Sequence, residues 1–396
     1  MRQRRILYNS DGWNIFFNAV HPDRPLSAQD VGGYVKEVAF SGSQVDTFIL
    51  CVNAGLAYYP SRVIPMYGQE GYDPKDAVDV PASQKLLGEN LRRLLADGLD
   101  PVGLVIDQAR ELGLEVILSY RMNDAHHLDE DTPMMPPFWR EHPQWRTDRN
   151  ARFGGAYDYA VPQVRRFMLD QLAEVLDRYG HKIDGLELDW MRFPRYFNPG
   201  CESQGLAILT EFTREVKKLI DQTAAARRRK LLLTARVWHR PDFCLRDGFD
   251  VFAWAEQGLI DFLTISRFLR NGEGTLDVAA FRSQITSLPI YGAIEVGSHN
   301  VWPANADERA IYDERVRPHL LATPDQYRRE SLRLWNDGAD GIYLFNFFCP
   351  RETGIEPDFS LLAELGDPRT IKKPSGEFAY CTSVSQLLSQ VEAQKE

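Results

Sequence analysis

The chain has few of the features that mark disulfide-rich, zinc-binding and membrane proteins. Its 396 residues contain only five cysteines, which are Cys51, Cys201, Cys244, Cys349 and Cys381. They are odd in number and widely spaced, without a C-x-x-C pair, which argues against a disulfide framework and a structural zinc site. No apolar run is long enough to span a bilayer. Since 44% of the residues are apolar, we expect a fold held together by a large apolar core.

The chain also lacks an excess of positive charge. Its formal net charge is −10 and its isoelectric point is about 5.4, which argues against a nucleic-acid-binding surface. The one basic run, Arg227-Arg228-Arg229-Lys230, lies between a predicted helix and a predicted strand and is interpreted as a solvated turn. The first ten residues contain no apolar signal-peptide core. We therefore expect a cytoplasmic protein, unless a secretion signal has been trimmed from the chain.

Two motifs of nucleotide and serine chemistry are missing as well. The stretch Ser10-Asp11-Gly12-Trp13, which follows the first strand-like segment, does not match G-x-G-x-x-G. No G-x-S-x-G elbow for a nucleophilic serine is present. We therefore expect no cofactor and no serine nucleophile.

What the chain does contain is a regular alternation of strand-like and helix-like segments. Eight apolar segments are typical of strands: 5–9, 47–52, 115–120, 183–194, 231–238, 261–266, 289–296 and 341–347. Helical patterns occupy 101–113, 162–179, 203–222, 250–257, 275–287 and 324–336. Eight such alternations favour a (β/α)8 TIM barrel, with an open doubly wound sheet as the alternative.

The lengths of the connecting segments refine this prediction. We expect the barrel over residues 1–365, with long loops after the second strand (54–100) and the third strand (123–161). Long ordered loops in a compact domain are usually functional. Residues 366–396 are expected to form a tail that packs on the barrel or frays.

The fourth strand carries two acids in an otherwise apolar sequence. Side chains of a strand alternate between its faces, so Glu187 and Asp189 should point one way and Leu186, Leu188 and Trp190 the other. Strands covered by helices are normally apolar on both faces. Buried acids are costly unless they are used, paired or solvated.

Polar and aromatic side chains follow the other strands at their carboxyl ends. A TIM barrel brings such residues together at one mouth, where its active sites are built. The expected set also includes Ser266 and Arg267, and its predicted substrate-binding members are Asn9, Asp11, Trp13, Asn53, Arg121, Asn123, His126, Arg192, Arg236, Trp238, His239 and Asn346.

Carboxylates among amides and aromatic rings suit glycoside chemistry. One acid protonates the leaving oxygen, and the other attacks carbon or activates water. We predict Asp189 and Glu295, from the fourth and seventh strands, as the catalytic pair, with Glu187 as a third member. The sequence does not decide which of these residues is the general acid. It also leaves open whether the reaction retains or inverts the configuration of the sugar.

Four arginines fall at or just beyond strand ends: Arg121, Arg192, Arg236 and Arg267. Guanidinium groups bind carboxylate and sulfate in a forked geometry, which favours an acidic sugar such as a uronate or a sulfated unit. The competing explanation is that these arginines neutralise the acids of the barrel.

Other readings of the same residues stay open. Glu187 and Asp189 could form interior ion pairs, and Glu295 could be structural. Asp11, His126 and His239 with a carboxylate would suit a metal-dependent hydrolase, although the adjacent His126 and His127 are better interpreted as loop residues than as metal ligands. A sugar-binding barrel without catalysis and a lyase on uronate polymers are further alternatives.

A resemblance adds to this reading. The segment Asp184-Gly185-Leu186-Glu187-Leu188-Asp189-Trp190-Met191-Arg192-Phe193-Pro194 resembles the "DGI-hydrophobic-x-D-(Y/W)-x-R-(F/Y)-P" signature of glycosyl-hydrolase-like TIM barrels. The order of strands extends the resemblance over residues 5–365. It implies a glycoside-hydrolase-type barrel with an acid at Asp189, whereas Glu187 stands where many such sequences have an uncharged residue. We therefore predict a glycoside hydrolase of oligosaccharides or polysaccharides, with no nucleic-acid or membrane partner and an open oligomeric state.

Overall fold

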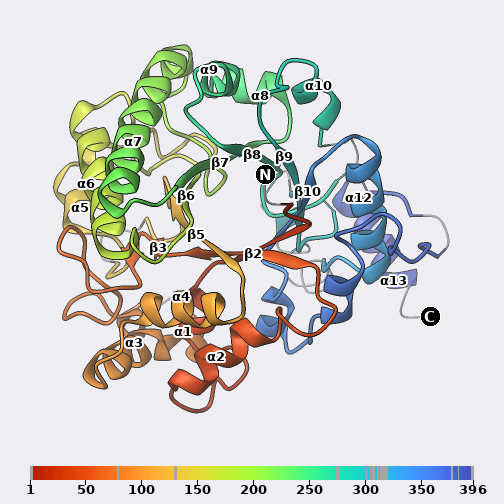
Figure 1. Cartoon of the computed structure of the whole chain (residues 1–396), viewed down its shortest axis with the longest axis horizontal. Helices are drawn as coiled ribbons and strands as arrows, with labels where there is room; N and C mark the ends of the chain where they lie inside the picture. Colours follow the sequence, from red (N-terminus) through yellow and green to blue (C-terminus); the bar gives the residue numbers. More distant parts are fainter. Residues whose placement is uncertain are drawn as a thin grey trace.

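Eight parallel strands close into a barrel in the computed structural model of the chain (Figure 1). They follow the chain around the ring, and β10 pairs with β1 to complete it. The strands are β1 (Ile6–Ser10), β2 (Val45–Cys51), β5 (Glu115–Arg121), β6 (Gly185–Asp189), β7 (Leu232–Trp238), β8 (Phe262–Ser266), β9 (Ile290–Glu295) and β10 (Gly341–Phe345). The predicted (β/α)8 barrel is thus confirmed.

Helices surround the ring of strands (Figure 1). They are α1 (Trp13–Phe16), α2 (Ala28–Lys36), α3 (Leu87–Ala96), α4 (Pro101–Glu111), α5 (Pro137–Glu141), α6 (Pro162–Tyr179), α7 (Gly205–Arg227), α8 (Pro241–Arg246), α9 (Val251–Glu256), α10 (Val278–Arg282), α12 (Pro324–Asn336) and α13 (Val384–Ala393). Short 3-10 helices are η1 (Pro74–Asp76), η2 (Ala82–Leu86), η3 (Pro143–Trp145), η4 (Glu202–Gln204), η7 (Cys349–Thr353) and η8 (Phe359–Ala363).

The structure describes residues 3–77, 80–128, 132–272, 276–299, 301–303, 305, 308–309, 312, 320–375, 378–381 and 383–393. Parts of four predicted segments lie outside these residues: 78–79 of the loop after the second strand, 129–131 of the loop after the third strand, 275 of a predicted helix, and 376–377, 382 and 394–396 of the tail.

The helix boundaries follow from local capping. α12 begins after Thr323, whose hydroxyl accepts from the Gln326 amide while the Gln326 side chain accepts from the Thr323 amide. This reciprocal capping box satisfies backbone donors that a helix start leaves unpaired. α6 begins with Pro162, which suits a first helical position because it has no N–H to leave unpaired. Both helices span the predicted ranges, 162–179 and 324–336.

The loop predicted over residues 54–100 contains more regular structure than expected. A hairpin of β3 (Asn53–Ala54) and β4 (Leu56–Ala57) opens it, and the ten-residue helix α3 closes it. Leu87, Leu91 and Leu94 are buried on one face of α3. Their spacing of four and three residues is the signal of an amphipathic helix. The segment is therefore a long connection with a helix of its own.

Four aspartates brace the amino-terminal rim of the barrel. They lie at the start of every second strand around the ring, where a strand's first backbone N–H would otherwise lack a partner. Each carboxylate accepts a hydrogen bond from a backbone N–H at or next to the start of the preceding strand. The pairs are Arg5–Asp46 at 2.8 Å, Val116–Asp184 at 2.9 Å, Leu233–Asp261 at 3.0 Å and Ile290–Asp340 at 2.7 Å.

The two faces of β6 separate as the alternation predicts. Leu186, Leu188 and Trp190 belong to the large core that lies between the strands and the helices. Glu187 and Asp189 face the barrel interior, where they bond to side chains of other strands. The interior is apolar towards its amino-terminal end, in a cluster that includes Leu7, Ile117 and Phe262. Glu187 and Asp189 thus lie nearer the carboxyl ends of the strands than this apolar cluster does.

The tail packs through a small apolar cluster of its own. Val384 and Leu387 of α13 contact Val301, Tyr312 and Leu320 of the segment that follows β9. Before α13, the Tyr380 hydroxyl bonds to Glu330 and the Ser375 amide bonds to Asp325 at 2.9 Å, both on α12. The described tail is therefore attached to the side of the barrel that carries α12.

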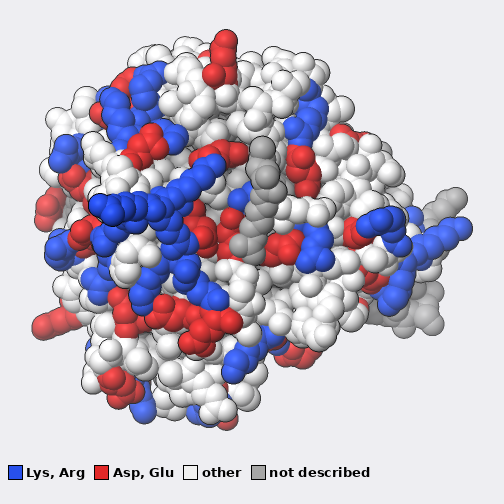
Figure 2. All heavy atoms as spheres, in the orientation of Figure 1, with Lys and Arg blue, Asp and Glu red and all other residues white. Residues whose placement is uncertain are grey.

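Charges of both signs mix on the surface. Figure 2 shows basic side chains gathered on one face with acidic ones directly beside them. In the run that was interpreted as a solvated turn, Arg229 forms an ion pair with Asp184, and Lys230 lies 3.3 Å from Asp261. Among the described residues, no helix is long and apolar enough to cross a membrane.

Candidate active site

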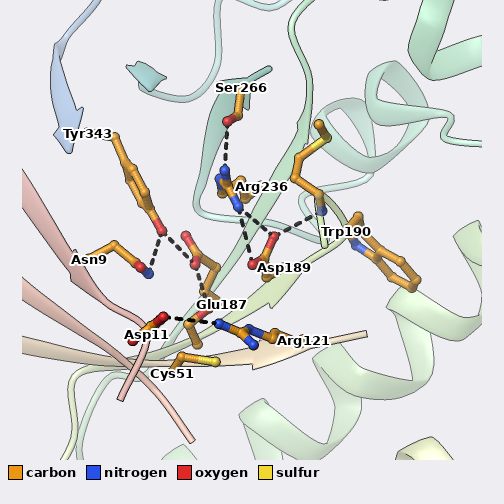
Figure 3. Close-up of polar contacts among 12 residues, drawn as sticks. Asn9, Asp11, Cys51, Arg121, Glu187, Asp189, Trp190, Arg236, Ser266 and Tyr343 are labelled. Carbon is orange, nitrogen blue, oxygen red and sulfur yellow. Dashed lines mark hydrogen bonds and ion pairs between the residues drawn. The ribbon is translucent and has the colours of Figure 1, made fainter. Parts of the chain in front are cut away.

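One guanidinium group joins the two predicted catalytic acids. Figure 3 shows its contacts with Asp189 and Ser266. Arg236 of β7 donates to Asp189 at the end of β6, at 3.1 and 3.3 Å, and to Glu295 at the end of β9, at 2.8 Å. All three side chains are buried, with Asp189 1% exposed and Glu295 0%. The Asp189 carboxylate also accepts from the Met191 amide at 2.9 Å. The structure therefore brings the predicted pair together, and it does so through a buried ion-pair network.

One carboxylate oxygen of Glu295 is hydrogen-bonded within the described structure, and the other is not. Its Oε1 accepts from Arg236 and from the Ser266 hydroxyl at 2.7 Å, whereas its Oε2 has no hydrogen-bond partner among the described residues. Burial raises the pKa of Glu295, and Arg236 and Ser266 oppose this rise. A buried oxygen without a partner is rare in folded proteins and calls for a ligand, a water or a catalytic role.

Arg236 is held in its charged form by the acids around it. Burial works against the charge, but Asp189 and Glu295 outweigh it and raise the pKa of Arg236. The guanidinium also stacks 3.7 Å from the centre of the Phe345 ring. The interior ion pair that the sequence offered as an alternative for Glu187 and Asp189 is therefore present at Asp189, and Glu295 forms an ion pair with the same arginine.

Glu187 lies one layer deeper and is fully buried. Its Oε1 accepts from the Ser119 hydroxyl at 2.8 Å and from the Tyr343 hydroxyl at 2.9 Å, while its Oε2 has no partner in the described part of the chain. Burial and the nearby Asp189 raise the pKa of Glu187 from 4.5 to about 7. Glu187 thus holds a proton more readily than an ordinary glutamate.

This raised pKa makes a testable contribution to stability. A carboxyl group with a higher pKa in the folded than in the unfolded chain stabilises the fold below the unfolded pKa and loses that contribution as the pH rises through the folded pKa. We expect the free energy of unfolding of the wild type, relative to Glu187→Gln, to fall by roughly 3 kcal/mol between about pH 4.5 and pH 8. Urea unfolding of both proteins across this range measures it, and a difference independent of pH would contradict the assignment.

A second charged network lies beside the acid pair. Arg121 forms ion pairs with Asp124 at 3.2 Å and with Asp11 at 3.7 Å. His126 bonds to Asp124 through Nδ1 and to Arg192 through Nε2, each at 2.8 Å. Burial lowers the pKa of His126 to about 4, so the ring is neutral near pH 7. Both ring nitrogens of His126 are therefore occupied by protein groups.

Three predicted substrate-binding residues are engaged by other parts of the protein. Asn53 exchanges hydrogen bonds with the backbone of Arg121, and Asn123 does so with the backbone of Tyr157. The Trp13 indole donates to Gln84 at 3.0 Å and packs edge-on against a tyrosine. These contacts brace the loops that border the mouth.

Two predicted amides keep a free acceptor in the interior. Asn9 donates to the Tyr343 hydroxyl at 2.9 Å, as Figure 3 shows, and its Oδ1 has no partner among the described residues. Asn346, just beyond β10, also has an unpartnered Oδ1 in the part of the chain that is described, and it is 6% exposed. Its φ of 55° lies in the left-handed region that asparagine tolerates best after glycine.

A cleft of about 510 Å³ opens at the ends of β7 and β8. Trp238 and His239 line it, as does Arg267, which directly follows Ser266. The loop residues Arg152 and Phe153, which follow β5, form part of its wall. The cleft therefore adjoins the strands that carry Arg236 and Ser266, although Asp189 and Glu295 do not line it.

Three residues of the network were not singled out as site residues by the sequence reasoning. Tyr343 and Ser119 contact Glu187, and Glu352 accepts a hydrogen bond from Asn14 at 2.9 Å near Asp11. Tyr343 and Ser119 lie in the middle of apolar strands, where only the closed barrel reveals which face they share with an acid. Glu352 follows β10 and carried a weak signal as an acid just beyond a strand end.

The residues suggested for a metal-dependent hydrolase contact different parts of the protein. No group of three or more histidine, cysteine or acidic side chains in the described ranges is arranged to hold a metal ion. His126 is bound to Asp124 and Arg192, whereas His239 lines the cleft. His126 and His239 therefore lie in different surroundings.

Comparisons by sequence identify no relatives: no protein-family model matches the chain, and no curated protein matches it. Solved structures share its fold at low identity. The glycoside hydrolase domain of PgaB (BpsB) from Bordetella bronchiseptica is 11% identical, with a TM-score of 0.54 over 93% of this chain and 99% of that one. This likeness concerns the fold alone.

Two further solved structures are similar at TM-scores of 0.49. Alpha-L-fucosidase isoenzyme 2 from Paenibacillus thiaminolyticus is 14% identical over 100% of this chain and 50% of that one, so the chain spans half the length of that fucosidase. The endo-1,4-beta-mannanase from Rhizomucor miehei is 12% identical over 92% of this chain and 94% of that one. The closed ring of eight parallel strands itself shows that the chain is a TIM barrel.

Proposed function

We propose that the protein is a glycoside hydrolase that cleaves an oligosaccharide or polysaccharide with Asp189 and Glu295. The observation that carries this proposal is the unpartnered Glu295 Oε2, next to a second carboxylate held by the same guanidinium. Both acids end their strands on the side of the barrel where (β/α)8 enzymes build their sites. The similarity to glycoside hydrolase structures is compatible with this proposal as an analogy of fold.

The two acids would divide the reaction between them. Burial raises the pKa of Glu295, which suits a general acid that protonates the leaving oxygen. Asp189 accepts from Arg236 and from the Met191 amide, and it would serve as the nucleophile or as the base that activates water. Arg236 would position both carboxylates. Glu187 lies one layer deeper in the barrel and, when charged, would repel the Asp189 carboxylate.

The cleft would bind the sugar next to these acids. Trp238 and Phe243 offer apolar ring faces to sugar C–H groups, and His239 offers a polar edge to hydroxyl groups. Arg121, Arg192 and Arg236, which suggested an acidic substrate, already contact protein side chains. Arg192 nevertheless keeps its Nε and Nη1 without a hydrogen-bond partner among the described residues, so an acidic substrate could still contact it.

A second candidate is carbohydrate binding without catalysis. The burial of Asp189 and Glu295 favours it, because a sugar reaches these acids only if neighbouring side chains move. In that case Asp189→Asn would leave sugar binding intact and no glycan would be turned over.

A substrate screen separates these functions. We would incubate the wild type and Asp189→Asn with neutral and acidic oligosaccharides and identify the products by mass spectrometry. Hydrolysis adds one water to each cleaved bond, whereas a lyase forms an unsaturated product that absorbs in the ultraviolet. We expect hydrolysis by the wild type and none by the variant. Binding without any cleavage would support the second candidate, and loss of cleavage on chelation would support a metal-dependent hydrolase.

A further inference from the structure

The cleft at the ends of β7 and β8 does not reach the two acids of the proposed reaction. Asp189 and Glu295 are buried, and neither of them lines the cleft. A sugar that lies in the cleft can contact them only if the side chains in between move. Those side chains therefore control when the acids meet a substrate.

Aromatic rings from three loops form the wall of the cleft on the side of the acids. Phe153, after β5, and Phe268, after β8, line the cleft. The ring of Phe193, after β6, packs against both, with ring centres 6.4 and 5.6 Å apart. Phe193 also meets the His126 ring edge-on, at 4.5 Å between centres. We call these three phenylalanines the aromatic wall.

Arg192 connects the aromatic wall to the acid pair. Its guanidinium lies 5.7 Å from the centre of the Phe193 ring and 5.7 Å from that of the Phe345 ring. The Phe345 ring in turn stacks 3.7 Å from the guanidinium of Arg236, which holds both acids. Residues 192–193 therefore stand between the cleft and the acid pair.

Arg192 has few partners for a buried charge. It is 4% exposed, and its Nη2 donates to Nε2 of the neutral His126 ring at 2.8 Å. Its Nε and Nη1 have no hydrogen-bond partner in the part of the chain that the structure describes. Buried donors without partners are costly, and a guanidinium has five N–H groups to satisfy. A rearrangement that gives these N–H groups an acceptor is therefore favoured.

Phe193 has an unfavourable backbone conformation. Its φ of 51° lies in the left-handed region, which disfavours a residue with a side chain roughly tenfold. Pro194 follows it, and a residue before proline prefers an extended backbone. Strained residues of this kind persist only where their surroundings hold them, and they cluster at switches. A change of Phe193 to the extended region would relieve the strain and move its ring out of the aromatic wall.

We propose that residues 192–194 form a gate between the cleft and the acid pair. In the closed form, which the structure shows, Phe193 packs within the aromatic wall. In the open form, Phe193 is extended, the cleft reaches Asp189 and Glu295, and the Arg192 N–H groups donate to sugar oxygens. The gate rests on the proposed function, because it matters only if these acids act on a bound glycan.

Carboxyl labelling tests the gate without a substrate. A water-soluble carbodiimide couples glycinamide to the carboxyl groups that it can reach, and mass spectrometry of peptides gives the labelling rate of each acid. Phe193→Ala removes a ring from the aromatic wall, so we expect Glu295 to be labelled at least about tenfold faster than in the wild type. Glu115, a buried acid at the start of β5 that pairs with Arg4, should keep its rate.

Phe243→Ala is the matched control. Phe243 also lines the cleft, but it packs against the rings of Trp238 and His239. Its loss widens the cleft and leaves the gate closed, so Glu295 should be labelled at the wild-type rate. Phe193→Leu keeps part of the apolar contact and should give a smaller increase, which keeps the test valid if Phe193→Ala does not fold. Thermal melts establish which variants are folded.

Two outcomes would overturn the gate. One is a Glu295 labelling rate that neither Phe193 variant changes, and the other is an equal increase at Glu115 or in Phe243→Ala, which would mean general loosening. Cleavage of a glycan by the wild type, together with either outcome, would refute the gate and leave the hydrolase in place. A selective increase at Glu295 in a protein that cleaves no glycan would support the gate and count against the hydrolase.

Discussion

Replacing Arg236 with methionine should lower the free energy of unfolding by about 3–5 kcal/mol near pH 7. Arg236 is 1% exposed and is the hydrogen-bond partner that joins Asp189 and Glu295. Removing one partner of a buried ion pair leaves the opposite charge without compensation, and here two carboxylates lose theirs. Methionine keeps contact with the Phe345 ring, so the loss reports mainly on charge.

Urea unfolding measures this effect, with Arg240→Met as control. Arg240 pairs with Asp242 at the surface, where both side chains are about half exposed, and its loss should cost at most about 1 kcal/mol. The deficit of Arg236→Met should also shrink as the pH falls, because burial raises the pKa of Glu295 and its protonation removes a buried charge. A deficit similar to that of Arg240→Met at pH 7 would show that the buried network contributes little.

Replacing Glu295 with glutamine should reduce the rate of glycan cleavage by about 10²–10⁴-fold. The amide has the shape of the carboxyl group, and its oxygen can still accept from Ser266 and Arg236, but it has no proton to transfer. The pH–rate profile of the wild type should decline at high pH as Glu295 loses its proton. The residual activity of Glu295→Gln should lack this decline.

Glu115→Gln is the matched control for the kinetic experiment. Glu115 is also a buried acid paired with an arginine, Arg4, but it lies at the start of β5 at the opposite end of the barrel. Its replacement should lower stability and leave the rate within a few-fold of the wild type. Equal rates for Glu295→Gln and the wild type would remove Glu295 from the mechanism, whatever the fold of the protein.

The fold could be predicted from sequence because its signals are local. The alternation at Leu186, Glu187, Leu188 and Asp189 reveals the two faces of β6, and both faces are used as expected. Helix α3 was missed although Leu87, Leu91 and Leu94 carry a helical spacing, because the proline- and aspartate-rich residues before it are typical of loops. Helix boundaries shifted in both directions: α10 is shorter than the predicted 275–287, whereas α7 continues to Arg227, beyond the predicted end at 222.

The partners within the site could not be predicted in the same way. Arg236 can join Asp189 to Glu295 only because closure of the barrel places β7 and β8 between β6 and β9. Likewise, an asparagine after a strand has the same appearance in sequence whether it binds a ligand or, as Asn53 does, the backbone of a neighbouring strand. Such pairings depend on contacts between distant segments, which composition and spacing do not encode.

The aspartates at the amino-terminal rim have a consequence for rearranging the chain. Each joins two consecutive strands, so the ring divides into four two-strand units, β1–β2, β5–β6, β7–β8 and β9–β10, and the neighbouring strands β10 and β1 belong to different units. New ends placed between other units, for example between β6 and β7, would keep all four rim bonds within short stretches of chain. A cut inside a unit would turn one of them into a contact between opposite ends of the polypeptide. Circular permutants of this barrel should therefore tolerate cuts between units better than cuts within them.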